Sequence, residues 1–289
     1  MNFCAIRCWL MDDRAARPLK AHTLRKGSLE KRLRLQRGID VLVNTSLSRV
    51  WRFVRHPWRI RMAFYERSVA SNNQALSWLF PQLREEEIEA CRLDFLRNHR
   101  FFTELNTRLV EKRHRRFVPG WREFVYMAVR FARPKMVLET GVFDGESSAV
   151  ILQALTDNRE GELLSVDLPA VDTIHRSTSG MRETVLPPGL SPGWVIPDPL
   201  RHRHRLELGD SRELLPEILQ SLQSVDIFLH DSLHTFDHMS FEYSTAWAHL
   251  RDGGLLLSDD ILWNSAFHSF CRPLNRKYVR IGGFGAVRK

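Results

Sequence analysis

Short apolar runs alternate with helical stretches along the second half of the chain, from residue 135 onward. The β-branched and apolar runs predict strands at 135–139, 162–167, 205–209, 226–230 and 254–258. A 3.6-residue periodicity predicts helices at 146–156, from 210 to about 222, and at 236–250. Strands that alternate with helices are typical of a parallel, doubly wound sheet of the Rossmann-like α/β class.

The two ends of the chain depart from this alternation. Two short strands at 278–281 and 284–287, joined through Gly282-Gly283, predict a closing hairpin and an antiparallel last strand. The first half shows helical periodicity and no strand alternation, with breaks at His56-Pro57 and Pro119-Gly120. We therefore predict a basic helical region over 1–97 and a seven-stranded α/β domain over 98–289.

Charge is distributed unevenly over the 289 residues. Residues 1–134 carry a formal net charge of +15 and residues 135–289 carry −6. The Arg-rich stretch 25–67, with apolar residues interleaved, suits docking on the phosphates of nucleic acid or on an anionic membrane. A solvated basic helix face is the simpler interpretation, and no RNA-binding motif accompanies the charge.

Several classes of protein are excluded by composition. The four cysteines are scattered without a C-x-x-C pair, which argues against a structural zinc site or a disulfide framework. No apolar run approaches the roughly 18 residues of a membrane span. The N-terminus has Arg7 within its apolar stretch and Asp12-Asp13 after it, so we expect a cytoplasmic protein rather than a secreted one.

The first candidate motif follows the strand at 135–139 and opens a helix. Its spacing is G-x-x-x-G rather than the dinucleotide G-x-G-x-x-G, and an acid ends the strand. An acid repels pyrophosphate but suits an ammonium group, and S-adenosylmethionine (SAM) carries an ammonium, a carboxylate and no phosphate. The glycines would allow a tight turn and a close approach of a ligand to the backbone. The residues concerned are Glu139, Gly141, Gly145 and Ser147.

Polar residues also end the next two strands. Asp167, at the end of the second strand, stands where an acid holds a ribose diol. Asp210 and Ser211, after the third strand, are candidates for the edge of an adenine ring, although either residue also suits a helix N-cap.

Acids gather after the fourth and fifth strands, whose carboxyl ends open onto the same crevice. Three carboxylates there repel one another, and oxygen-only ligands favour Mg²⁺ or Ca²⁺ as the compensating cation. Helix capping without a metal is the alternative. Zinc held by His234 and His238 is disfavoured because the Glu of a zincin motif is missing. The candidate metal ligands are Asp231, Asp259 and Asp260.

The motifs together resemble a known family. The runs VLETGVFDGESSAVILQAL, GELLSVDLP, GDSRELLP, DIFLHDSLHTFDH and GGLLLSDDI, in this order, look like a class I SAM-dependent methyltransferase over about residues 100–289. More narrowly, they resemble bacterial O-methyltransferases of glycans and natural products. They are also similar to metal-dependent enzymes for catechols and macrolide sugars, in which three ligands occupy the places of Asp231, Asp259 and Asp260.

The resemblance implies a role for each position. Glu139, Gly141 and Gly145 would hold the methionine part of SAM, Asp167 the ribose, and Asp210 with Ser211 the adenine.

We therefore expect O-methylation of a small molecule or glycan, with Mg²⁺ as the candidate metal. A hydroxyl acceptor must lose its proton, and Asp231 or His234 would act as the base. The segment 168–204, rich in Pro and Gly, would cover the acceptor, with Trp194 and the cluster 201–205 as contacts.

Other hypotheses stay open at this point. A methyltransferase docked through residues 25–67 would act on RNA or on a lipid-linked acceptor. A dehydrogenase on the same sheet is disfavoured by the missing G-x-G-x-x-G. A homo-oligomer is neither indicated nor excluded.

Overall fold

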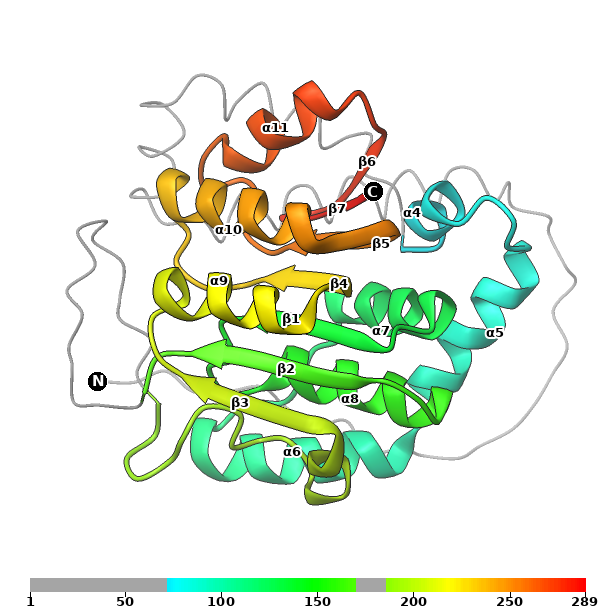
Figure 1. The fold of residues 1–289 in the computed structure, drawn as a ribbon. Helices are drawn as coiled ribbons and strands as arrows, with labels where there is room; N and C mark the ends of the chain where they lie inside the picture. Colours follow the sequence, from blue (N-terminus) through cyan, green and yellow to red (C-terminus); the bar gives the residue numbers. More distant parts are fainter. Residues whose placement is uncertain (1–71, 170–185) are drawn as a thin grey trace, which may run out of the picture. The chain divides into compact units, whose positions relative to one another are not determined.

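A seven-stranded mixed sheet forms the centre of the fold (Figure 1). The computed structural model describes residues 72–169 and 186–289. The sheet has the order β3-β2-β1-β4-β5-β7-β6. Its strands are β1 (Met136–Thr140), β2 (Glu162–Asp167), β3 (His204–Leu208), β4 (Val225–His230), β5 (Leu250–Ser258), β6 (Tyr278–Ile281) and β7 (Phe284–Arg288).

Strand direction follows the prediction. All strand pairs among the first five strands are parallel, whereas β7 pairs in the antiparallel direction with both β5 and β6. The predicted doubly wound sheet with an antiparallel last strand is therefore confirmed. β5 begins at Leu250, four residues earlier than its apolar run suggested, because Leu250 pairs with Val225 of β4 across an irregular register.

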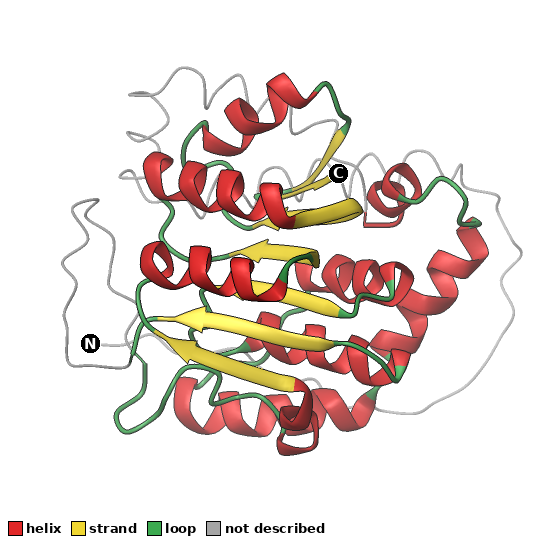
Figure 2. Ribbon diagram, viewed as in Figure 1, coloured by secondary structure: helices red, strands yellow, loops and turns green. Residues whose placement is uncertain are grey.

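Helices cover both faces of the sheet (Figure 2). One face carries α4 (Asn72–Leu79), α5 (Glu85–Leu96), α6 (His99–Arg113), α7 (Trp121–Ala132) and α8 (Glu146–Asn158). The other carries α9 (Ser211–Leu222), α10 (Phe236–His249) and α11 (Ala266–Cys271). Short 3₁₀ turns lie at η2 (Asp198–Arg203) and η3 (Arg272–Leu274).

Neighbouring strand residues supply the two cores in alternation. Val137 and Leu163 belong to the cluster beneath α7 and α8, while Leu138 and Leu164 belong to the cluster beneath α9 and α10. Successive strand side chains point to opposite faces, so a strand buried on both faces shows a continuous apolar run. This is the origin of the runs seen in the sequence.

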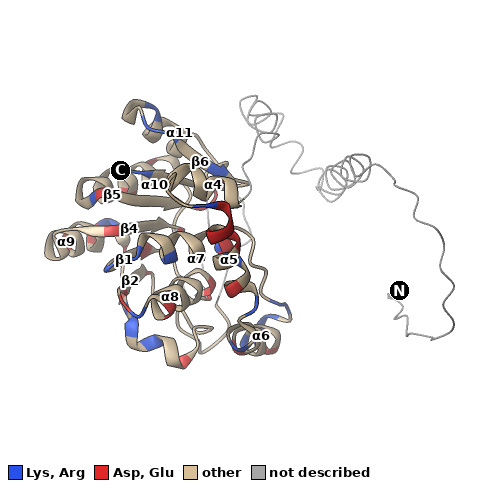
Figure 3. Ribbon diagram, turned by 90° about the vertical axis from the view of Figure 1, so that its right-hand side faces the viewer, with Lys and Arg blue, Asp and Glu red and all other residues tan. Residues whose placement is uncertain are grey.

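The first half follows the predicted helical pattern where it is described. Three glutamates fill the first turn of α5, where the helix dipole favours negative charge, and they stand out in red in Figure 3. The predicted break at Pro119-Gly120 is present, since residues 114–120 separate α6 from α7. The Arg-rich stretch 25–67 lies outside the described residues.

The chain groups into two units, residues 1–60 and 61–289. Helices α4 and α5, which the sequence assigned to the N-terminal region, bury Leu76, Ile88 and Phe95 in the same core as the sheet. The predicted boundary at residue 97 stays a prediction. Within the described ranges, none of the helices is both long and apolar enough to cross a membrane.

Candidate functional site

The loop between β1 and α8 is fixed by two glycines with positive φ. Gly141 has a φ of +83°, and a Cβ there would lie 2.1 Å from the carbonyl oxygen of Asp231. Gly145 has a φ of +97°, and its Cβ would lie 2.6 Å from the Cα of Gly193. The predicted tight turn is present. The close approaches that exclude a side chain are made by the protein backbone, so ligand contact at Gly145 stays a prediction.

Glu139 lies beneath this loop with its carboxylate fully buried. Its oxygens accept hydrogen bonds from the hydroxyls of Ser147 (2.6 Å), Ser148 (2.6 Å) and Ser165 (2.8 Å). Burial raises the pKa of Glu139, although the three hydroxyls oppose the shift. Glu139, predicted to hold the methionine part of SAM, and Ser147, a candidate cofactor-binding residue, bind each other and order the start of α8, and contact of either residue with a cofactor stays a prediction.

Asp167 ends β2 as predicted and reaches the same loop. Its Oδ2 accepts from the backbone N–H groups of Val142 (2.9 Å) and Phe143 (2.7 Å), and its Oδ1 accepts from Leu168 (2.7 Å). Burial raises the pKa of Asp167 despite these bonds. Each carboxylate oxygen offers about two acceptor sites and three of the four are used, so one acceptor site, on Oδ1, remains for a ribose hydroxyl.

The residues predicted for the adenine edge have structural partners. Asp210 caps α9 by accepting from the backbone N–H of Arg212 at 2.8 Å, which confirms the capping alternative. Ser211 is buried and donates to Glu242 at 2.6 Å. Contact between either residue and an adenine stays a prediction.

Glu242 of α10 is a residue that the sequence analysis missed. Its fully buried carboxylate binds the hydroxyls of Thr140 (2.6 Å) and Ser232 (2.9 Å) and the imidazoles of His230 and His238 (2.5 and 2.9 Å), besides Ser211. Burial alone would raise the pKa of Glu242, but the hydrogen bonds from the two histidines outweigh it and the pKa lies well below its usual range. One carboxylate thus joins the ends of β1 and β4 to the starts of α9 and α10.

The three predicted metal ligands form an acidic edge beyond β4 and β5. Burial, followed by the charge of Asp259, raises the pKa of Asp231 well above its usual value. Burial, followed by the charge of Asp260, raises the pKa of Asp259 to about 6. Across the ranges that the structure describes, no group of three or more His, Cys, Asp or Glu side chains is placed to hold a metal ion.

The two farther aspartates are engaged by the protein itself. Asp259 accepts from the side chain of Trp121 and, at 2.8 Å, from the backbone N–H of Asp260. Asp260 accepts from the side chain of Trp263. The acids therefore interact through their charges, but their oxygens turn toward different donors.

Buried polar atoms without a hydrogen-bond partner gather at this edge. In the described part of the chain there are four such side-chain atoms, and three of them are His230 Nε2, His234 Nε2 and Arg122 Nε. The rings of His230 and His234 meet at 5.2 Å, and His234 Nε2 lies 3.7 Å from Asp231 Oδ1. Burial, followed by the charge of His230, lowers the pKa of His234 to about 3, so its imidazole is neutral at physiological pH. The sequence-predicted base candidates Asp231 and His234 are thus brought together.

The cover predicted for 168–204 is described from residue 186 onward. Trp194 Nε1 donates to Asp144 Oδ1 at 2.8 Å, and Arg113 donates to the same carboxylate at 2.7 Å. Arg201 and Arg203 donate to the backbone oxygens of Gly193 and Gly161. Trp194 thus fastens the segment to the β1–α8 loop, and Arg203 ties it to the turn before β2. Acceptor contact by Trp194 and 201–205 stays a prediction.

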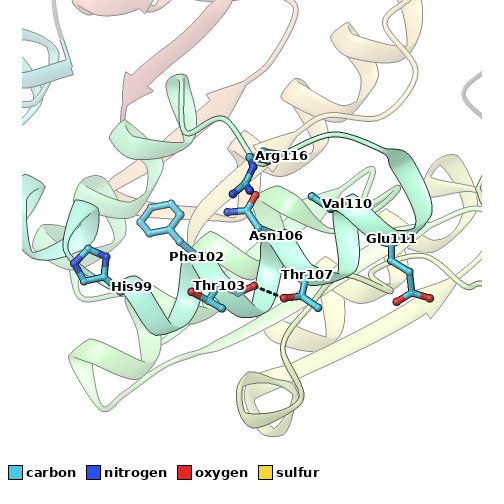
Figure 4. Close-up of a pocket in the computed structure, with 8 residues that line it drawn as sticks. All are labelled: His99, Phe102, Thr103, Asn106, Thr107, Val110, Glu111 and Arg116. Carbon is cyan, nitrogen blue, oxygen red and sulfur yellow. Dashed lines mark hydrogen bonds between the residues drawn. The ribbon is translucent and has the colours of Figure 1, made fainter. Parts of the chain in front are cut away.

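A separate hollow lies on the outer side of α6 (Figure 4). It is lined by His99, Phe102, Thr103, Asn106, Thr107, Val110, Glu111 and Arg116. None of the sequence-predicted site residues lines it, so we place the candidate site at the carboxyl edge of the sheet.

Comparisons with known proteins find similarity to methyltransferases. Residues 138–261 match a family model described as a methyltransferase domain, and this range spans the strand ends described above. Curated protein sequences gave no match to the chain.

Solved structures with similarity to the chain include several methyltransferases. One is the O-methyltransferase from Bacillus cereus in complex with SAH (12% identity, 71% of this chain and 97% of that chain covered, TM-score 0.44). Another is a caffeoyl-CoA O-methyltransferase, so described, from Staphylococcus aureus (12%, 71% and 99%, TM-score 0.46). A third is the O-methyltransferase TomG from Streptomyces achromogenes in complex with SAM (13%, 72% and 98%, TM-score 0.42).

Proposed function

We propose that residues 138–261, which match a model described as a methyltransferase domain, are of the class I SAM-dependent kind and that the protein transfers a methyl group from SAM to a hydroxyl oxygen of a small molecule or glycan. The observation that carries the proposal is the carboxyl edge of the sheet. There the β1–α8 loop, Asp167 and the acidic edge surround buried polar atoms that lack a partner.

The carboxylates at this edge suit the cationic groups of SAM. The molecule carries an ammonium and a sulfonium, and buried carboxylates favour nearby cations. Asp167 is held at the tip of β2 by three backbone N–H groups, which orients its oxygens for a ribose diol. When bound, SAM supplies an electrophilic methyl group.

The chain's own residues would orient the acceptor and remove its proton. Alignment of the acceptor oxygen is the main contribution that an enzyme makes to a displacement of this kind. Asp231, whose pKa is raised by burial, and His234, whose Nε2 has no hydrogen-bond partner, are the two candidates to accept the hydroxyl proton.

The test uses methyl-labelled SAM, the full chain and a panel of sugars, phenols and extracted metabolites. We expect label in a small-molecule ether, and we expect His234→Asn to retain SAM binding while transfer slows at least about a hundredfold, within the range typical of general-base loss. Label that enters only RNA would instead favour docking through residues 25–67. Absence of SAM binding would contradict the proposal altogether.

Metal assistance is not part of the proposal. Asp259 and Asp260 are directed toward two indole groups, and the described residues form no metal-holding group. The donor set therefore does not fit Mg²⁺ as it stands, and no step is derived through a metal.

Thermal melting tests whether the acidic edge binds Mg²⁺. We expect the melting temperature to be the same in EDTA and in Mg²⁺, for the full chain and for Asp259→Asn alike, because the carboxylates already have protein donors. A Mg²⁺-dependent rise that disappears in Asp259→Asn would restore the sequence-based prediction of a metal site.

Removal of the Asp167 carboxylate is expected to weaken SAM binding at least tenfold. A ribose hydroxyl would lose its hydrogen bond to a charged acceptor, which is worth about 1.5–3 kcal/mol. Isothermal titration of Asp167→Ala measures the loss, with Asp157→Ala, far from the strand ends on α8, as the control. Unchanged affinity in Asp167→Ala would remove the ribose assignment.

A further inference from the structure

Arg122 is anchored at the acidic edge by an aromatic stack. It is the second residue of α7, and its guanidinium carbon lies 4.4 Å from the centre of the Trp121 ring. That ring stacks on Phe284 of β7 at 4.4 Å with an interplanar angle of 12°. Since the Trp121 side chain also donates to Asp259, the stack fixes Arg122 beside the carboxyl ends of β4 and β5.

The guanidinium of Arg122 has an unused donor. Its Nε is buried and lacks a hydrogen-bond partner, and within the described residues Arg122 forms no ion pair. Nearby arginines differ in this respect, since Arg92 pairs with Glu123 at 3.0 Å and Arg113 with Asp144 at 2.7 Å. A buried guanidinium N–H without a partner is costly, which indicates that a ligand completes it.

The start of α7 adds to the positive potential. Its N-cap is Gly120, which has no side chain to cap the helix, and the backbone N–H groups of Arg122 and Glu123 donate to the carbonyl oxygens of Pro119 (2.9 Å) and Gly120 (3.4 Å). A helix N-terminus carries a partial positive charge that favours anions. The unpartnered Arg122 Nε–H, which lies at the positive end of the α7 dipole, therefore favours an anionic group at this place.

The surroundings restrict what that anion is. Arg122 interacts by charge with Asp231 and Asp259, so a free anion would meet carboxylates a short distance away. A zwitterion avoids this conflict, because its cation faces the acids while its anion faces the arginine. The amino-acid end of SAM is such a group, with an ammonium and a carboxylate on one carbon.

We infer that Arg122 binds the carboxylate of the methionine moiety of SAM through its guanidinium N–H groups. The inference rests on the proposed function and adds to it a binding residue upstream of the matched methyltransferase domain. Arg122 is thus a specificity residue that distinguishes SAM from analogues lacking the carboxylate.

The test compares two ligands that differ in the carboxylate alone. Isothermal titration of the full chain with SAM and with decarboxylated SAM gives an affinity ratio for each variant. We expect the wild-type protein to favour SAM at least tenfold, and Arg122→Met to bring the ratio close to one by weakening SAM alone. Arg122→Lys should give an intermediate ratio, because it keeps the charge but loses the planar fork.

Arg116→Met is the matched control, since Arg116 is an exposed arginine six residues earlier on the preceding loop. It should leave the ratio unchanged. The ratio is internal to each protein, so partial unfolding of a variant lowers both affinities and does not imitate the expected result.

The possible results distinguish a failure of the proposed function from a failure of the role inferred for Arg122. A wild-type protein that binds neither ligand would overturn the proposed function and the inference with it. A wild-type protein that favours SAM, with the same preference in Arg122→Met, would overturn the inference alone. A variant that binds SAM normally but loses transfer would assign Arg122 to the acceptor instead and would equally contradict the inference.

Discussion

Gly141→Ala is expected to destabilise the protein severely, by about 3–4 kcal/mol, from overpacking and a left-handed backbone together. The new Cβ would lie 2.1 Å from the carbonyl oxygen and 2.4 Å from the carbonyl carbon of Asp231, and 2.6 Å from the backbone nitrogen of Ser232. These atoms belong to the backbone after β4, which pairs with β1, so the clash cannot be relieved by a rotamer change. Urea denaturation measures the loss.

Gly189→Ala is the matched control for this change. Gly189 has a similar φ of +76°, but a Cβ there would meet nothing within 4 Å. We expect a cost of about 1–2 kcal/mol from the backbone conformation alone. Equal losses in the two variants would show that the contact between the β1–α8 loop and the end of β4 is looser than described.

Glu242→Gln is expected to cost about 3–5 kcal/mol, the range for breaking a buried, charged network. The carboxylate accepts hydrogen bonds from three hydroxyls and two imidazoles, and an amide cannot serve all five donors. Glu217→Gln, at an exposed position of α9, should change the free energy of unfolding by less than about 0.5 kcal/mol.

The Glu242 effect should depend on pH in a defined direction. Its pKa is lower in the folded protein than in the unfolded chain, so the ionised carboxylate stabilises the fold above the ordinary glutamate pKa of 4.5. That stabilisation is lost as the pH falls below this value. The difference between the wild-type protein and Glu242→Gln in urea denaturation should therefore shrink on acidification, and a difference that grows would contradict the role assigned to Glu242.

The fold was predictable because most strands have a local apolar pattern that can be recognised without knowledge of the neighbouring strands. A strand buried on both faces, such as Glu162–Asp167, shows a mostly apolar run, interrupted here by Ser165, with an acid at its tip, and its bounds were predicted without error. By contrast, Leu250 looked like the end of α10, since nothing local distinguishes a helix end from a strand that begins through its pairing with Val225.

The sequence predicted where the candidate site lies, but it did not predict the hydrogen-bond partners of the site residues. The motif positions do converge on one edge, but the sequence could not show that Glu139 turns inward to three serines. A sequence pattern does point to Glu242. It forms an i, i+4 polar pair with His238 on the face of α10 that buries Met239 and Tyr243. No sequence pattern points to Arg122, because its position depends on the stack of Trp121 on Phe284, which is far away in the chain.

The most direct test of the central claim is a crystal structure of the full chain grown with SAH, the demethylated product of SAM. The account predicts density for SAH at the carboxyl ends of β1, β2 and β4, with the ribose at Asp167, the ammonium toward Asp231 and the carboxylate at Arg122. Density for SAH at another place, such as the hollow on α6, or none at a saturating concentration, would contradict the assignment of this edge as the methyltransferase site.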